Sequence, residues 1–145
     1  MGERDDALFR VAAETVESLA GLLPCPRESP AQSAAPWEAA FRVTFEGAGR
    51  GEMRLTFFGG AGAAVAAGMI GRREGADAAD ALGELANIVC GNFLPFVYGA
   101  EARCRLSRPT PVQPGDPPAG APGAAARLPL GSGRLDIEFR EGGRP

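Results

Sequence analysis

Hydrophobic and polar positions separate onto two sides of one long amphipathic segment in the second half of the chain. At about 100° per residue, the polar positions fall within a sector of roughly 60°; they are Asp80, Glu84, Asn87 and Gly91. The apolar positions on the opposite side are Leu82, Leu85, Ala86, Val89 and Phe93. The pattern predicts a helix from about Gly75 to Phe93, ended by Pro95, with one buried face and one face open to a partner.

Two shorter segments alternate strictly between apolar and polar residues, which is the period of a β-strand. These segments are Phe41–Phe45 and Met53–Phe57, and the glycine-rich stretch Glu46–Gly51 separates them. The arrangement predicts a β-hairpin with one buried face. The residues expected on that face are Phe41, Val43, Phe45, Met53, Leu55 and Phe57.

The N-terminal segment has the spacing of a second amphipathic helix. Its apolar positions are Leu8, Val11, Ala12, Val16, Leu19 and Leu22 or Leu23. We expect Asp5 or Asp6 to cap this helix and Pro24 to stop it. A linker rich in Pro, Ser and Ala follows at 26–36, and the small apolar residues of 59–71 predict a short helix pressed against the sheet.

The C-terminal part predicts three further strands. Ala102, Cys104 and Leu106 alternate with arginines in a strand that reaches Pro109. Leu128–Leu130 and Leu135–Phe139 form a second hairpin, in which Pro129 favours an edge strand because it has no N–H to donate. Between the strand that reaches Pro109 and this hairpin, residues 112–126 are mainly Pro, Gly and Ala. With so little apolar surface to bury, we expect this segment to be a mobile loop.

The order of elements is therefore helix, two strands, short helix, long helix and three strands. This order is typical of an α+β protein with an antiparallel sheet and helices packed on one face. A length of 145 residues with 45% hydrophobic content suits one domain, taken as residues 1–145. The long helix is expected to bury its apolar side on the sheet and to turn Asp80, Glu84 and Asn87 to solvent.

Composition narrows the chemistry. The chain has no His and no Lys, so all 15 of its cations are Arg. This excludes an imidazole general base, the Ser-His-Asp and Cys-His systems, a Schiff-base lysine and a phosphate-loop lysine. Cys25, Cys90 and Cys104 are odd in number and lack CxxC spacing, so we expect small free thiols and no metal site.

Charge and hydropathy give the expected surroundings. The net charge is −3, and the arginines are scattered along the chain, which indicates neither a nucleic-acid surface nor an anionic-membrane surface. The charged first residues are unlike a signal peptide, and no apolar stretch approaches the length of a membrane span. We expect a soluble, cytoplasmic protein.

Two sequence motifs resemble a known family. The run Asp80–Asn92, DALGELANIVCGN, is followed about twenty residues later by Leu106–Val112, LSRPTPV. Together they resemble the chemotaxis phosphatases of the CheC, CheX and FliY group. The resemblance extends from about residue 6 to residue 140, and both asparagines of the chain, Asn87 and Asn92, lie within it.

The resemblance implies a function and a site. Members of the family remove the phosphoryl group from the aspartyl phosphate of a CheY-like response regulator. By analogy, Glu84 docks against a lysine of the regulator and Asn87 orients the attacking water, while Asp80 matches an acidic or small polar position of the motif. The protein needs no cofactor of its own, because the regulator brings Mg²⁺. The resemblance also implies a homodimer formed by strand pairing.

Neighbouring positions on the helix complete the expected partner-binding face. Ile88 lies roughly 40° from Glu84 on the helical wheel and is expected to add an apolar contact to the regulator. Gly91 falls within the same polar sector. Asn92, expected near the helix C-terminus, is interpreted as a local cap or backbone contact.

Two other functional classes stay open. An ExxN spacing also arises by chance on solvated helices, and a non-catalytic interaction module of the same fold would bind a response regulator, receptor or flagellar switch component through the same face. A small-molecule enzyme is disfavoured because the sequence shows no cluster of titratable groups that would form a pocket.

Overall fold

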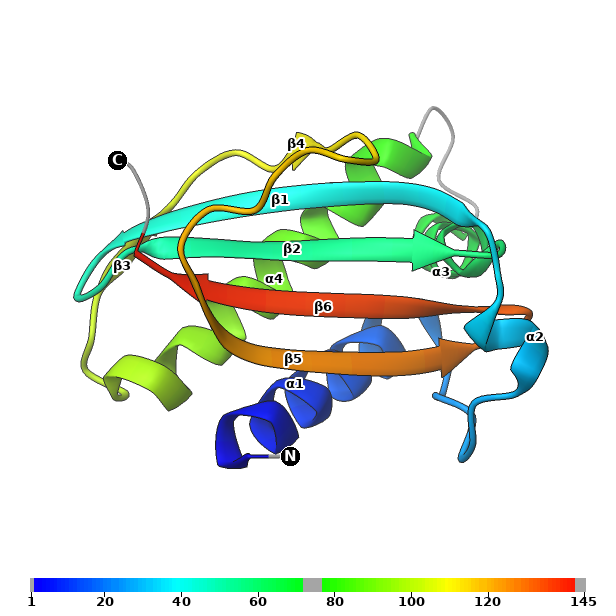
Figure 1. Cartoon of the computed structure of the whole chain (residues 1–145), viewed down its shortest axis with the longest axis horizontal. Helices are drawn as coiled ribbons and strands as arrows, with labels where there is room; N and C mark the ends of the chain where they lie inside the picture. The colour runs from blue at the N-terminus through cyan, green and yellow to red at the C-terminus, as the bar shows by residue number, and fades with distance from the viewer. Residues whose placement is uncertain (1, 72–76, 143–145) are drawn as a thin grey trace.

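One antiparallel sheet carries all its long helices on a single face, as Figure 1 shows. The computed structural model describes residues 2–71 and 77–142. Within these residues the strand order is β3-β1-β2-β6-β5, and β4 also pairs with β1. The strands are β1 (Trp37–Gly47), β2 (Gly51–Phe58), β3 (Cys104–Leu106), β4 (Thr110–Pro111), β5 (Ala121–Leu130) and β6 (Gly133–Glu141). The helices are α1 (Glu3–Ala20), α2 (Pro30–Ser33), α3 (Ala61–Ile70) and α4 (Ala78–Tyr98). The predicted fold class is confirmed.

The β1–β2 hairpin forms in the predicted register. Phe41 pairs with Leu55 and Val43 with Met53, so that alternate side chains of both strands point to the helices. All six residues predicted for the buried face are buried. Both strands extend beyond the predicted ends, because backbone pairing with β6 on one side and β3 on the other continues past the apolar core.

The first helix starts earlier and stops sooner than the sequence indicated. It begins at Glu3, with Gly2 as the N-cap residue, and Asp5 takes part in the capping from the third helical position: its carboxylate accepts a hydrogen bond from the Gly2 N–H at 3.0 Å. Pro24 was expected to stop the helix, but the helix already ends at Ala20. It ends there because Gly21 takes a left-handed conformation with φ of 71°. Within the predicted linker the short helix α2 forms, capped by Ser29.

The predicted short helix is confirmed as α3, and it packs closely on α1. A Cβ added at Gly68 would lie 2.2 Å from the Ala20 carbonyl oxygen, so a side chain at this position would force the two helices apart. This close approach needs glycine at position 68.

The long helix passes through the proline that was expected to end it. Asp77 caps the first turn by accepting from the Ala79 N–H at 2.7 Å, and the expected start at Gly75 lies outside the described residues. The expected end before Pro95 is wrong, since α4 continues to Tyr98. Proline removes one hydrogen bond, the one that the Gly91 carbonyl would accept, and the turn beyond it closes with a bond from the Gly99 N–H to the Pro95 carbonyl.

The expected mobile loop is partly a strand. The prediction is wrong for residues 121–126, which pair with β6 as the first half of β5. Their small side chains need little burial of their own, because the partner strand supplies the large core residues Ile137 and Phe139. The prediction is wrong for Val112 too, which is buried and donates its N–H to the Ala40 carbonyl at 2.9 Å. For residues 113–120, mobility stays a prediction. The edge position of Pro129 is confirmed, since β5 is the outermost strand on its side of the sheet.

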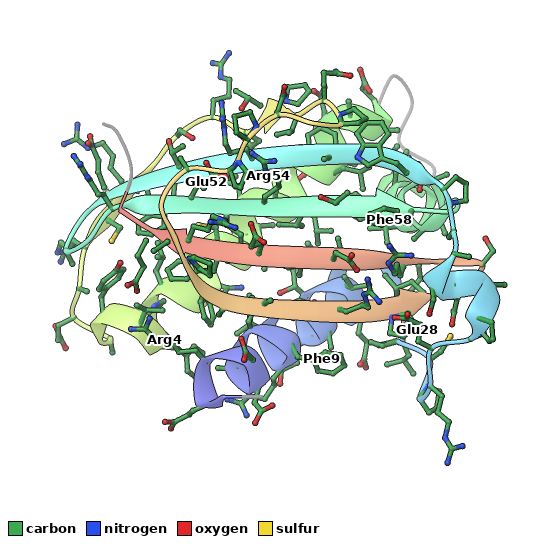
Figure 2. The ribbon with its side chains drawn as sticks, viewed as in Figure 1. Arg4, Phe9, Glu28, Glu52, Arg54 and Phe58 are labelled. Carbon is green, nitrogen blue, oxygen red and sulfur yellow. The ribbon has the colours of Figure 1, made fainter. Side chains whose placement is uncertain are left out.

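Residues 112–120 cross the face of the sheet opposite the helices, in front of β1 and β2 in Figure 1. Figure 2 shows Arg54 and Glu52 on β2 beneath this crossing. Arg54 donates to the carbonyls of Asp116 and Pro117, at 2.8 and 3.3 Å, and Glu52 accepts from the Ala119 N–H at 3.3 Å. Polar contacts from β2 therefore hold residues 112–120, which have little apolar surface of their own. The hydrophobic periodicity of the sequence does not reveal such contacts.

Aromatic residues tie α4 to the sheet. The ring of Phe139 on β6 stacks on Phe45 of β1 at 5.4 Å and meets Phe93 of α4 edge-on at 5.0 Å between centroids. All three side chains belong to a cluster of buried residues that runs from α1 across the sheet to α3 and α4. The orientation of the long helix is thus fixed by its apolar side.

The expectation that no apolar stretch approaches the length of a membrane span is wrong for α4, which among the described residues is long and apolar enough to cross a membrane. Half of the relevant stretch is buried inside the fold. Core helices of folded proteins share this property, and the aromatic contacts above account for the hydropathy of α4.

Candidate functional site

The polar side chains Asp80, Glu84 and Asn87 form a strip along α4, and this polar strip borders a groove of about 390 Å³. The opposite wall is the segment that follows β3 and contains β4. Residues of the strip that line the groove are Asp80, Glu84 and Asn87, with Gly83 at its floor; Arg108, Pro109 and Pro111 line it from the other side. The structure therefore brings three of the predicted site residues together with the second sequence motif.

Backbone pairing with β1 fixes the far wall of the groove. The Ser107 N–H donates to the Thr44 carbonyl at 2.8 Å, and the Ser107 hydroxyl oxygen accepts from the Thr44 N–H at 2.9 Å. Five residues later, the Val112 N–H donates to the Ala40 carbonyl at 2.9 Å. The residues between these two anchors have little freedom to move along the strand.

Gly83 sets the distance between α4 and this wall. A Cβ at position 83 would lie 3.3 Å from Cβ of Pro109, which is tighter than most such contacts. Gly83 is buried, and the proline packs directly over the helix backbone. The glycine of the first motif and the proline of the second are thus explained by one close contact.

Asn87 presents an amide with free hydrogen-bonding capacity. The side chain is half-buried, and its Oδ1 is buried without a hydrogen-bond partner in the described part of the chain. Buried polar atoms are nearly always paired, and an unpaired one costs about 1–3 kcal/mol. Such an atom in a groove is typical of a site that is completed by a water molecule or a partner.

Asp80 and Glu84 are exposed carboxylates. Neither makes an ion pair or a hydrogen bond within residues 2–71 and 77–142. One turn of helix separates them, so both project toward solvent beside Asn87. Their charges are available to a partner that approaches α4.

Ile88 and Gly91 lie apart from this groove. Ile88 is half-buried and lines a second groove of about 420 Å³ between α1 and α4, together with Asn92 and Phe96. Gly91 faces β3, where a Cβ would lie 3.6 Å from a methyl carbon of Leu106. The helical wheel gives angles but not neighbours, so it did not reveal that α1 and β3 occupy these flanks. Their partner-binding role stays a prediction.

Asn92 does not cap the helix. It is exposed and precedes the last helical residue, Tyr98, by six positions, so the expectation of a cap is wrong. Asn92 lines the groove between α1 and α4, whereas Asn87 lines the groove between α4 and Arg108–Pro111. The two asparagines of α4 therefore lie in different grooves.

Cys90 is unsuited to nucleophilic chemistry. Burial, followed by the charge of Cys104, raises the pKa of Cys90 to about 12, so that its thiol stays protonated at neutral pH. All three are free, and Cys25 and Cys104 are half-buried. Among the described residues no group of three or more His, Cys, Asp or Glu side chains is arranged to hold a metal ion.

Sequence reasoning missed Arg108. This residue lies between Ser107 and Pro109 of the second motif and lines the groove opposite Asn87. The signal in the sequence was its place in the second motif, directly before Pro109. The contact of Pro109 with Gly83, which brings Arg108 to the groove, is visible only in the structure.

Comparison with known proteins gives the same family as the two sequence motifs. The model of the family described as chemotaxis phosphatase CheX matches residues 40–128. Chemotaxis protein CheX from Desulfovibrio desulfuricans has 18% identity and a TM-score of 0.71, with 97% of this chain and 100% of that chain covered. CheX from Vibrio vulnificus has 19% identity and a TM-score of 0.69, with 97% of both chains covered. No curated protein matches the chain.

A third structure contains a partner. In the complex of CheX with CheY, BeF₃ and Mg²⁺ from Borrelia burgdorferi, one chain has 10% identity to this one, a TM-score of 0.59, and coverage of 94% of this chain and 96% of that chain. These structures share the fold, and the family match spans both walls of the groove, from β1 through α4 to β5. The chain belongs to the CheX family.

Proposed function

We propose that this protein is a phosphatase that accelerates hydrolysis of the aspartyl phosphate of a CheY-like response regulator, in the cytoplasm. The observation that carries the proposal is the Asn87 amide, whose buried Oδ1 is unpaired among the described residues and lies in the groove between α4 and Arg108–Pro111. The CheX family and the CheX–CheY complex of the Borrelia relative support the choice of partner.

The proposed mechanism needs little chemistry from this chain. Phosphoryl transfer depends mainly on positioning and on charge stabilisation. An amide has one acceptor and two donor hydrogens, so Asn87 can hold the attacking water and a phosphoryl oxygen together. Glu84 and Asp80 project beside it, and Glu84 pairs with a lysine of the regulator. The regulator supplies Mg²⁺, the phosphoryl group and the lysine, which suits a chain without His or Lys.

Phosphate release tests the proposal. Each phosphorylated response regulator of the same genome is mixed with the purified protein, and the half-life of its aspartyl phosphate is measured. We expect one regulator, or a few, to lose phosphate faster in the presence of the protein. If every regulator keeps its intrinsic rate, the non-catalytic interaction module takes the place of the phosphatase.

Replacing Glu84 with Ala is expected to weaken the complex with the phosphorylated regulator by about 10- to 100-fold, since a charge-assisted pair in the interface would lose one partner. The free energy of unfolding should change by no more than about 0.5 kcal/mol, because Glu84 is exposed and makes no contact that the fold needs. Titration calorimetry with the regulator in its beryllofluoride form measures the affinity.

Glu14 of α1 provides a matched control for Glu84. It is also an exposed helical glutamate, but it lines the groove between α1 and α4. Glu14→Ala should bind with nearly wild-type affinity. Equal losses for both variants would indicate general electrostatic attraction and would remove the specific role of Glu84.

We also propose a homodimer formed by antiparallel pairing of edge strands. One edge is largely occupied within the chain: the Ala125 N–H of β5 donates to Asp5 at 2.8 Å, and the Pro129 carbonyl accepts from the Cys25 N–H at 2.8 Å. The edge at Cys104–Leu106 of β3 is then the better candidate, since alternate backbone groups of β3 point away from β1.

Light scattering is expected to give the dimer mass at micromolar concentration. Cys104→Pro, which removes an N–H on the outer side of β3, should shift the protein toward monomer. Arg127→Pro removes an N–H on the outer side of β5, together with the ion pairs of Arg127 to Glu28 and Asp136, and should leave the dimer intact. A monomer mass for the unmodified chain, or loss of the dimer through the β5 variant alone, contradicts this assembly.

A further inference from the structure

The groove beside Asn87 contains a cation without a counter-ion. Arg108 is exposed, and its guanidinium makes no ion pair or hydrogen bond with residues 2–71 or 77–142. Most arginines on the sheet differ in this respect: Arg54, Arg127, Arg134 and Arg140 each pair with a carboxylate. The two acids that line the same groove, Asp80 and Glu84, are not partners of Arg108 either.

The backbone at Arg108 is held at a fixed place. Ser107 is bound to Thr44 through two hydrogen bonds, and Pro109 packs on Gly83. The side chain of Arg108 therefore starts from a position set by both β1 and α4. A guanidinium on a fixed base loses less freedom on binding than one on a loop, and its planar set of N–H donors suits two oxygens of a phosphoryl group.

The charges in the groove favour a cation there. Asp80 and Glu84 bring two negative charges to the site, and the proposed substrate is itself an anion. Like charges that approach within a few ångströms repel each other strongly when water is excluded from the interface. A guanidinium in the same groove offsets this repulsion and stabilises the charge that develops on the phosphoryl oxygens.

We propose that Arg108 binds the phosphoryl group of the regulator's aspartyl phosphate, opposite Asn87, and stabilises it during attack by water. The inference rests on the proposed phosphatase function and adds the residue that receives the anion. Asn87 positions the water, Glu84 selects the partner through its lysine, and Arg108 neutralises the transferred group.

Arg105 offers a matched control. It lies three residues before Arg108, is exposed, and has no ion pair in the described part of the chain. It lines a separate groove of about 450 Å³ with Arg42 and Glu52, away from Asn87. Arg105→Gln removes the same charge from the same segment, so any effect of net charge on association appears in both variants.

Arg108→Gln, Arg108→Lys and Arg105→Gln are compared in two assays. The first measures kcat and KM for dephosphorylation, and the second measures the affinity for the regulator with and without beryllofluoride and Mg²⁺. We expect Arg108→Gln to lower kcat by about 10- to 100-fold, the effect of losing a hydrogen bond to a charged group. Affinity for the beryllofluoride form should fall as well, whereas affinity for the unmodified regulator stays within about twofold.

The controls define what a positive result means. Arg108→Lys should recover part of kcat, because it keeps the charge but not the two-pronged contact. Arg105 lies on β3, the proposed dimer edge, so light scattering first checks that Arg105→Gln keeps the oligomeric state of the unmodified protein. The variant should then match the unmodified protein in both assays. Thermal unfolding of each variant shows that the fold is retained.

Three outcomes would overturn the inference. A wild-type kcat for Arg108→Gln, with Asn87→Ala inactive, removes Arg108 from the site but leaves the phosphatase function. Equal loss of affinity for both forms of the regulator assigns Arg108 to an acidic surface of the partner. If the unmodified chain releases no phosphate, the proposed function fails, and an unchanged affinity of Arg108→Gln for the beryllofluoride form then rejects the inference as well.

Discussion

Replacing Asn87 with Ala is expected to lower the dephosphorylation rate by about 10²-fold, the scale of losing one well-placed group that acts in the transition state. Affinity for the regulator should stay nearly unchanged, since the docking charges of Glu84 and Asp80 remain. The free energy of unfolding should change by no more than about 0.5 kcal/mol. The Asn87 side chain makes no hydrogen bond that the fold would lose, and its Oδ1 is unpaired among the described residues. Single-turnover phosphate release with saturating protein measures the rate.

Asn92→Ala is the matched control, because it removes the same amide from the same helix. Asn92 is exposed and lines the groove on the α1 side, five residues from Asn87. Its variant should keep the full rate. Full activity of Asn87→Ala, or unfolding of that variant, contradicts the catalytic assignment and favours a non-catalytic protein that binds through the same helix.

Periodicity predicted the parts of the fold that the core determines. The alternation in Phe41–Phe45 and Met53–Phe57 gives both the hairpin and its buried side, because a shift of one residue would turn every large side chain outward. The same holds for α4, whose apolar stripe contacts the sheet and leaves Asp80 and Glu84 exposed.

Segments held by polar or backbone contacts were not predictable in this way. The pairing of 121–126 with β6 depends on a partner strand whose side chains fill the core in their place. The path of 112–120 depends on Arg54, Glu52 and Arg140, which hold its backbone from a distant part of the sequence. Composition described this segment correctly as poor in apolar surface but contained no information about its partners.

The candidate site was predictable on α4 and not beyond it. The helical wheel places Asp80, Glu84 and Asn87 on one face, and the structure keeps them in one groove. It also places Ile88 and Gly91 nearby, but Ile88 faces α1 and Gly91 faces β3, and neither lines the groove. Arg108 joins the site through tertiary packing of Pro109 on Gly83, a contact that no local pattern records.

Phe93→Ala is expected to lower the free energy of unfolding by about 3–5 kcal/mol, the usual cost of removing a buried aromatic side chain. Phe93 is fully buried on α4 and meets the ring of Phe139 edge-on at 5.0 Å, so its loss leaves a cavity where the helix rests on the sheet. Chemical denaturation monitored by circular dichroism measures the change. The rate of dephosphorylation per folded molecule should fall much less than in Asn87→Ala, because Phe93 does not line the groove.

Phe96 separates the effect of burial from that of residue type. It lies on the same helix, three residues later, is 54% exposed, and its ring has a cation–π contact with Arg10 at 5.6 Å. Phe96→Ala should cost no more than about 1 kcal/mol, the scale of an exposed cation–π contact. Phe93 connects α4 to Phe139 and, through Phe139, to Phe45. A large decrease in the free energy of unfolding for Phe93→Ala, but not for Phe96→Ala, would show that these buried rings hold α4 and its polar side chains in place. Equal losses for the two variants would mean that the exposed contacts of Phe96 support α4 as much as the buried rings do. The placement of Asn87 relative to Pro109 would then rest on the close contact between Gly83 and Pro109.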